Sequence, residues 1–115
     1  MAQAVPGNHT GDIGAAVQSF VESMGFSVVR QYAGHGVGCA LHEPPEVPNF
    51  GKPGTGELLR ENMTIAIEPM VNEGTWKVRV LDDGWTAVTE DGMCSAHCEE
   101  TVLVQRSGPE VLTRE

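Results

Sequence analysis

The sequence predicts an α+β domain in which one N-terminal helix is followed by an antiparallel sheet. The first observation is an apolar stripe at helical spacing near the start of the chain, and the second is a series of short alternating segments after residue 62. The third is a set of turn signals between those segments. The length of 115 residues suits one domain, so we expect residues 1–115 to fold together.

The helix is predicted from apolar residues that recur at every third or fourth position. Its stripe consists of Ile13, Ala16, Val17, Phe20, Val21 and Met24. A stripe of this period gives a helix one apolar face that packs against the rest of the domain. Thr10 is the expected N-cap, Asp12 suits the positive end of the helix dipole, and Gly25 is the expected left-handed stop.

Between the helix and the later strands, the sequence predicts a short strand and then two glycine-rich segments. The β-branched residues of 26–32 favour a strand. Residues 34–38, with the sequence GHGVG, hold too many glycines for an ordinary strand interior and indicate a close approach of their backbone to another part of the chain. Residues 44–62 hold four prolines and three glycines, which predict an extended excursion with little regular structure.

The remaining strands are predicted from alternating apolar and polar residues. They cover residues 63–68, 76–80, 85–89, 101–105 and 110–113. Turn signals at Asp83-Gly84, Asp91-Gly92 and Ser107-Gly108 separate the later strands. Because each strand follows the previous one through a short connection, we expect an antiparallel meander.

Composition excludes several classes of partner. Lys+Arg is 7 against Asp+Glu 16, so the formal net charge is −9, which repels nucleic acids and anionic membrane surfaces. No apolar run approaches the roughly 18 residues of a membrane span, and residues 1–7 show no secretory signal. Three cysteines are too few for a disulfide framework. We therefore expect a cytoplasmic protein.

Histidine and glutamate side chains fall where a core is expected, and they are the candidate functional groups. His35 lies between glycines and His42 follows seven residues later, while Glu68 closes an apolar strand and Glu99 and Glu100 open another. A desolvated carboxylate needs a partner, and a divalent ion that accepts imidazole nitrogen and carboxylate oxygen is one such partner.

Simpler interpretations of the same residues stay open at this point. A histidine in a glycine loop is usually a hydrogen-bonding loop residue, and a glutamate at a strand end is usually exposed. The period of two residues does not decide which of Glu99 and Glu100 faces the core. Cys94, His97 and Cys98 are typical of half a structural zinc site, but the sequence offers no second pair of ligands at suitable spacing.

Three ordered motifs resemble the signature of type I methionine aminopeptidases, members of the M24 metallopeptidase family. The segments that carry the resemblance are 34–38 with 42–45, 63–70 with 83–86, and 95–104 with 110–113. The resemblance implies the pita-bread fold, in which two similar halves enclose a site for two metal ions. It also implies that residues 1–115 correspond to the C-terminal half of the catalytic domain.

The resemblance further implies roles for individual residues. His35, Glu68 and Glu99 correspond to metal ligands, and Glu99 rather than Glu100 corresponds to the carboxylate that bridges both ions. His42 corresponds to a histidine that contacts the scissile peptide. Leu41 and Trp85 fall at positions that line the pocket for the methionine side chain. The implied reaction is metal-dependent removal of the initiator methionine from nascent polypeptides.

The chemistry of these residue types agrees with that reaction. Two ions share and activate a water molecule, and a carboxylate such as Glu68 takes its proton and passes it to the leaving amine. Co²⁺, Mn²⁺, Fe²⁺ and Zn²⁺ all suit a site of nitrogen and oxygen ligands. His42 would stabilise charge on the peptide oxygen.

The sequence also departs from the family pattern. The family uses two further aspartate ligands that lie in the first half of its fold and are absent here, so we expect this chain alone to hold at most one ion. We expect the missing half or a second copy in a homodimer to complete the site, and otherwise an exposed apolar face. The alternative function is a non-catalytic module that binds a partner protein. Asn62 stands where the family tends to have glycine, which a left-handed turn tolerates.

Overall fold

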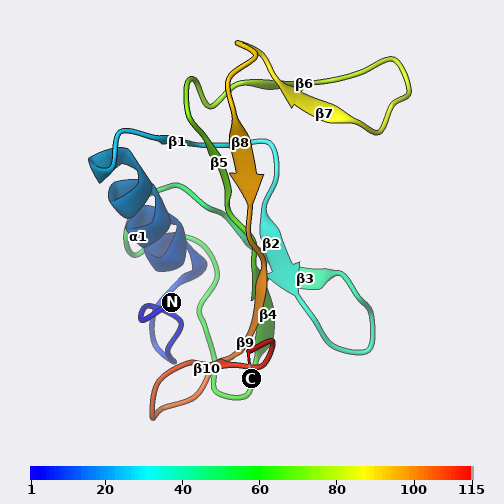
Figure 1. Cartoon of the computed structure of the whole chain (residues 1–115). Coiled ribbons are helices and arrows are strands. Elements are labelled where there is room, and N and C mark those ends of the chain that lie inside the picture. The colour runs from blue at the N-terminus through cyan, green and yellow to red at the C-terminus, as the bar shows by residue number, and fades with distance from the viewer. Residues whose placement is uncertain (115) are drawn as a thin grey trace.

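The computed structural model describes residues 1–114 and shows one helix packed beside small antiparallel sheets (Figure 1). Glu115, the last residue of the predicted domain, lies outside the described residues. The predicted order of a helix followed by antiparallel strands is confirmed. The elements are α1 (Thr10–Ser23), β1 (Ser27–Val28), β2 (Gly34–Gly36), β3 (Glu43–Val47), β4 (Thr64–Ile67), β5 (Met70–Asn72), β6 (Val78–Val80), β7 (Ala87–Thr89), β8 (Ser95–His97), β9 (Glu100–Leu103) and β10 (Glu110–Val111).

Helix α1 forms where the apolar stripe predicts it, but the expected N-cap is wrong by one residue. The N-cap is His9, whose backbone N–H donates to the Asp12 carboxylate at 2.6 Å, while the Asp12 N–H donates to the His9 carbonyl oxygen at 3.0 Å. The Thr10 hydroxyl instead accepts the backbone N–H of Glu57 at 3.1 Å. Local sequence does not reveal this partner, because it lies 47 residues away. Gly25 ends the helix with a positive φ of 83°, as predicted.

The predicted meander is wrong. The five-stranded sheet has the order β10-β9-β4-β2-β3, so β4 lies between β2 and β9, which are far from it in sequence. Ala66 pairs with His35 on one side and with Thr101 on the other. A second sheet has the order β1-β5-β8, and β6 and β7 form a hairpin that projects away from the other strands (Figure 1). Strands that are consecutive in sequence are therefore not always neighbours in the sheet, because long connections separate them. Short-range turn signals do not predict such an order.

The GHGVG segment approaches its neighbours as closely as its glycines predict, although it also forms an interior strand. A Cβ on Gly34 would collide with the Ala66 carbonyl oxygen of β4, and one on Gly36 would collide with the Pro44 carbonyl oxygen of β3. Residues 44–62 are expected to hold little regular structure, and strand β3 is the regular element at their start. Its prolines are tolerated because β3 is the edge strand of the sheet.

Other strands differ from the prediction mainly in extent. The strand expected over residues 26–32 is shorter and consists of β1 alone, and β5 and β8 form without any predicting pattern in the sequence. These are strands of two or three residues, too short to show a period. Asn62 has a φ of 72°, which agrees with its predicted place in a left-handed turn.

The core lies between α1 and the five-stranded sheet. It consists of Ala4, Ile13, Val47, Leu59, Ile65, Ile67, Val102 and Val104. Only part of the helical stripe reaches this core, because Phe20 is 69% and Met24 61% exposed. The end of α1 therefore presents apolar side chains on the surface of the described residues. Within residues 1–114, no helix combines the length and apolar character needed to cross a membrane.

The start of α1 generates a prediction about stability. Backbone N–H groups of His9 and Gly54 hold the pKa of Asp12 below its ordinary value. The stabilisation is therefore present above the ordinary aspartate pKa of about 3.9 and is lost as the pH falls through the lowered pKa. We expect Asp12→Asn to lower the melting temperature by a few degrees at neutral pH and to have little effect in strong acid.

Circular dichroism melts at both pH values check this expectation. Asp82→Asn is the matched control, because Asp82 is exposed and its side chain makes no hydrogen bond among the described residues. Equal melting temperatures for Asp12→Asn and the unaltered chain at neutral pH would contradict the role given to this carboxylate.

Candidate metal site

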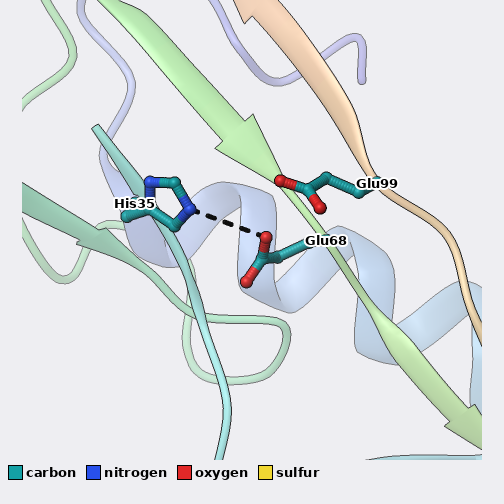
Figure 2. A group of neighbouring side chains, drawn as sticks. All are labelled: His35, Glu68 and Glu99. Atoms are coloured by element: carbon teal, nitrogen blue, oxygen red, sulfur yellow. Dashed lines mark ion pairs between the residues drawn. The ribbon is translucent and has the colours of Figure 1, made fainter. Parts of the chain in front are cut away.

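Three side chains from different strands converge at one point of the five-stranded sheet. His35 lies in β2, Glu68 follows β4, and Glu99 precedes β9. One ligand atom from each lies within 4.8 Å of the others, and His35 Nε2 is 3.6 Å from Glu68 Oε2 (Figure 2). The register explains this convergence. Ile67 pairs with Glu100, so Glu68 and Glu99 are the next residues along the two neighbouring strands.

The structure distinguishes Glu99 from Glu100, which the sequence period left undecided. Glu100 accepts hydrogen bonds from the Thr113 hydroxyl and, at 2.9 Å, from Arg114 Nε. The Thr113 hydroxyl and then the Arg114 guanidinium hold the pKa of Glu100 below its ordinary value. Glu99 instead directs its carboxylate toward His35 and Glu68 (Figure 2). Of these two glutamates, Glu99 is thus the one that can bind the same metal ion as His35 and Glu68.

The His35 ring is oriented so that one nitrogen is available to a ligand. Its Nδ1 lies 3.0 Å from the Gly36 carbonyl oxygen, a contact in which a proton on Nδ1 is the donor. In the neutral ring this leaves the lone pair on Nε2, the nitrogen that faces Glu68. A histidine that ligates a metal is commonly held in this way, with its other ring nitrogen donating to a carbonyl or carboxylate.

The electrostatics of the three residues favour a bound cation. Burial raises the pKa of Glu68, and the hydrogen bond and negative charge of neighbouring Glu99 raise it further. His35 and His97 act in the opposite direction but do not cancel this effect. A divalent ion between the two carboxylates would replace their repulsion with attraction. One imidazole nitrogen and two carboxylate oxygens are also a donor set that suits Mn²⁺, Fe²⁺, Co²⁺ or Zn²⁺.

His42 lies beside this cluster, and its role in contacting the peptide stays a prediction. The centroid of its ring is 3.9 Å from that of His35, and both rings line an open cavity of about 500 Å³. Leu41 and Trp85 do not form an apolar wall within the described residues, because they are 74% and 88% exposed. Their roles at a methionine pocket stay predictions.

The second candidate metal group of the sequence analysis does not form. Among residues 1–114, the only group of three or more His, Cys, Asp or Glu side chains with converging ligand atoms is His35, Glu68 and Glu99. Cys94 and Cys98 are exposed and free. His97 acts instead on the charge of Glu68. The sequence patterns connect His97 only with the half zinc site, and buried Asn49 belongs to none of the motifs, so neither residue could be linked to Glu68 from the sequence.

The chain matches the model of "Metallopeptidase family M24" over residues 1–106. It is 57% identical over 106 residues to a methionine aminopeptidase of Clostridium perfringens, covering 92% of this chain and 43% of that protein. It is 48% identical over 108 residues to a methionine aminopeptidase of Escherichia coli, covering 94% of this chain and 41% of that protein.

Solved structures agree with the sequence matches. The crystal structure of a methionine aminopeptidase from Thermotoga maritima superposes with a TM-score of 0.93 at 57% identity, covering 96% of this chain and 45% of that one. One from Rickettsia prowazekii superposes with a TM-score of 0.92 at 43% identity, with the same shares covered. The predicted pita-bread fold is thereby confirmed for the part of these structures that is matched. The chain spans less than half the length of these relatives.

The close carboxylates generate a second prediction. A raised glutamate pKa destabilises the fold at neutral pH, and this penalty disappears as the pH falls below the ordinary glutamate value of about 4.3. Glu99→Gln removes one of the two charges. We expect it to raise the melting temperature slightly at neutral pH, in the presence of EDTA, and to lose this advantage in acid.

Thermal melts at neutral and acidic pH measure this effect. Glu100→Gln is the matched control, because the adjacent residue carries the same charge but is bonded to Arg114 and Thr113. We expect that variant to be no more stable than the unaltered chain. A lower melting temperature for Glu99→Gln at neutral pH would show that the two carboxylates do not repel each other.

Proposed function

The chain belongs to metallopeptidase family M24, and from this premise we propose that it forms part of an aminopeptidase site that removes N-terminal methionine from nascent polypeptides. The observation that carries the proposal is the convergence of His35, Glu68 and Glu99 within 4.8 Å of one another. The names of the relatives support the choice of substrate. We also propose a cytoplasmic location, because such an enzyme acts on newly made chains.

We propose one divalent ion, of Co²⁺, Mn²⁺, Fe²⁺ or Zn²⁺, between these three residues. His35 would bind through Nε2, and Glu68 and Glu99 would each bind through a carboxylate oxygen. When bound, the ion supplies Lewis acidity and makes a water molecule a better nucleophile at neutral pH. Three protein ligands leave positions open for water and substrate, as catalytic sites require.

The protein residues then move the protons. Glu68 is the proposed base, because its carboxylate would lie beside both the bound ion and the attacking water. It would take a proton from the attacking water and return it to the leaving amine. His42, beside His35 at the open cavity, would donate to the peptide oxygen as negative charge develops there.

The methionine side chain requires an apolar pocket. We propose that Leu41 and Trp85 contribute to it once a further polypeptide covers them, since large exposed apolar side chains mark an interaction surface. We also propose that residues 1–115 correspond to the C-terminal half of the catalytic domain of the relatives. A second ion would need further carboxylates, supplied by the other half of the fold or by a second copy in a homodimer.

A non-catalytic role in binding another protein is the second candidate function. The exposed apolar residues Phe20 and Met24 at the end of α1 favour it, because such side chains are normally covered. The two functions differ in their dependence on Glu68. A binding role would tolerate the loss of its charge, whereas hydrolysis would not.

Release of methionine from a Met-Ala-type tripeptide tests the proposed function. We expect the chain to release methionine when Mn²⁺ or Co²⁺ is added and to stop when EDTA is added. We expect Glu68→Gln to lower the rate by about 100-fold or more, because it removes both a ligand and the proposed base.

Glu90→Gln is the matched control, since it removes the same charge from an exposed residue outside the site. Release that Glu68→Gln does not reduce would indicate a contaminating enzyme. No release at all would rule out catalysis by this chain alone and favour the role in protein binding or a dependence on the other half.

A further inference from the structure

A buried amide lies behind the proposed metal ligand Glu68. Asn49 is only 1% exposed, and its Nδ2 lies 3.5 Å from the backbone carbonyl oxygen of Glu68. Its Oδ1 is also buried and has no hydrogen-bond partner within the described part of the chain. An apolar side chain of similar shape would fill this place without desolvating an amide. Packing alone therefore does not account for an asparagine at this position.

The backbone of Glu68 lies where the strand ladder is interrupted. Ile67 is the last residue of β4 in the five-stranded sheet, and Met70 is the first of β5 in the three-stranded sheet. Pro69 between them has no N–H to donate. At this junction the Asn49 amide supplies a hydrogen bond to the Glu68 carbonyl.

The position of β2 explains how Asn49 reaches Glu68. Gly34 pairs with Val47 of β3, and the pairing of His35 with Ala66 places Gly34 next to Ile67 of β4. Asn49 lies two residues beyond Val47, and Glu68 lies one residue beyond Ile67. Gly34 lies between Val47 at the end of β3 and Ile67 at the end of β4. Just beyond these paired residues, the Asn49 side chain connects the two strand ends directly.

We propose that Asn49 is a positioning residue for the metal site: its amide holds the Glu68 backbone so that the carboxylate faces His35 and Glu99. The inference rests on the proposed function for its metal but concerns the location of Glu68 even without one. Groups that orient a ligand in this way commonly change metal affinity by about 10-fold to 100-fold when removed.

Asn49→Leu and Asn72→Leu form a matched pair of test variants. Leucine has the shape of asparagine but removes the hydrogen-bonding groups. Asn72 is also fully buried, and its Oδ1 has no hydrogen-bond partner among residues 1–114. Its Nδ2, however, donates to the Thr75 carbonyl oxygen at 3.0 Å rather than to a ligand residue. Both changes remove a buried amide, but only Asn49→Leu also removes a hydrogen bond to Glu68.

Titration calorimetry and Co²⁺ absorption spectra of the full chain provide the first measurement. We expect Asn49→Leu to weaken Co²⁺ binding about 10-fold or more and to alter the spectrum of the bound ion, while Asn72→Leu changes neither. Melting temperatures show whether both variants remain folded. Equal Co²⁺ affinity for Asn49→Leu and the unaltered chain would overturn the proposal.

Crystal structures of both variants without metal provide the second measurement. We expect the Glu68 carboxylate to move away from His35 Nε2 in Asn49→Leu and to stay in place in Asn72→Leu. If the unaltered chain does not bind Co²⁺, the proposed metal function of this chain fails, and these structures decide the role of Asn49 separately. A Glu68 carboxylate that keeps its position in Asn49→Leu would then overturn the proposed role of Asn49. Should Asn49→Leu not fold, Asn49→Ala takes its place in both measurements.

Discussion

The close approach of β2 to β3 and β4 is the constraint on which the rest of the structure depends. A side chain on Gly34 would collide with the backbone of β4, and one on Gly36 would collide with the backbone of β3. Without these glycines the three strands would have to separate. The same spacing sets His35 opposite Ala66, two residues before Glu68. The packing of the sheet and the assembly of the candidate site thus have one cause.

The fold also brings the carboxylates of Glu68 and Glu99 within 4.8 Å of each other, where their negative charges repel. Glu68 and Glu99 approach each other at the end of the β4–β9 pairing, and burial together with this approach raises the pKa of Glu68. The arrangement is unfavourable without a cation and favourable with one. Such a local cost is typical of functional sites, where neighbouring secondary structure holds groups in positions they would otherwise avoid.

Much of the local structure was predictable from the sequence. The apolar period located α1, the glycine turns located the β6–β7 hairpin, and alternation located β4. Residue type and position made His35, Glu68 and Glu99 candidate ligands. The family motifs then implied a role for each of them and selected Glu99 over Glu100. Short strands such as β5 and β8 were missed, because three residues are too few to show a period. Local sequence also predicts Thr10 as the N-cap, because the residue that its hydroxyl actually contacts, Glu57, is distant in sequence.

The sequence by itself determined the helix, the turns, the need for a glycine-rich strand and the family to which the motifs point. Only the tertiary structure decided the strand order, the face to which Glu99 turns and the contact between Asn49 and Glu68. The physical reason is that periods and turn signals report on interactions between near neighbours. The order of strands and the pairing of distant side chains depend on which long-range contacts bury the core best, and no short segment contains that information.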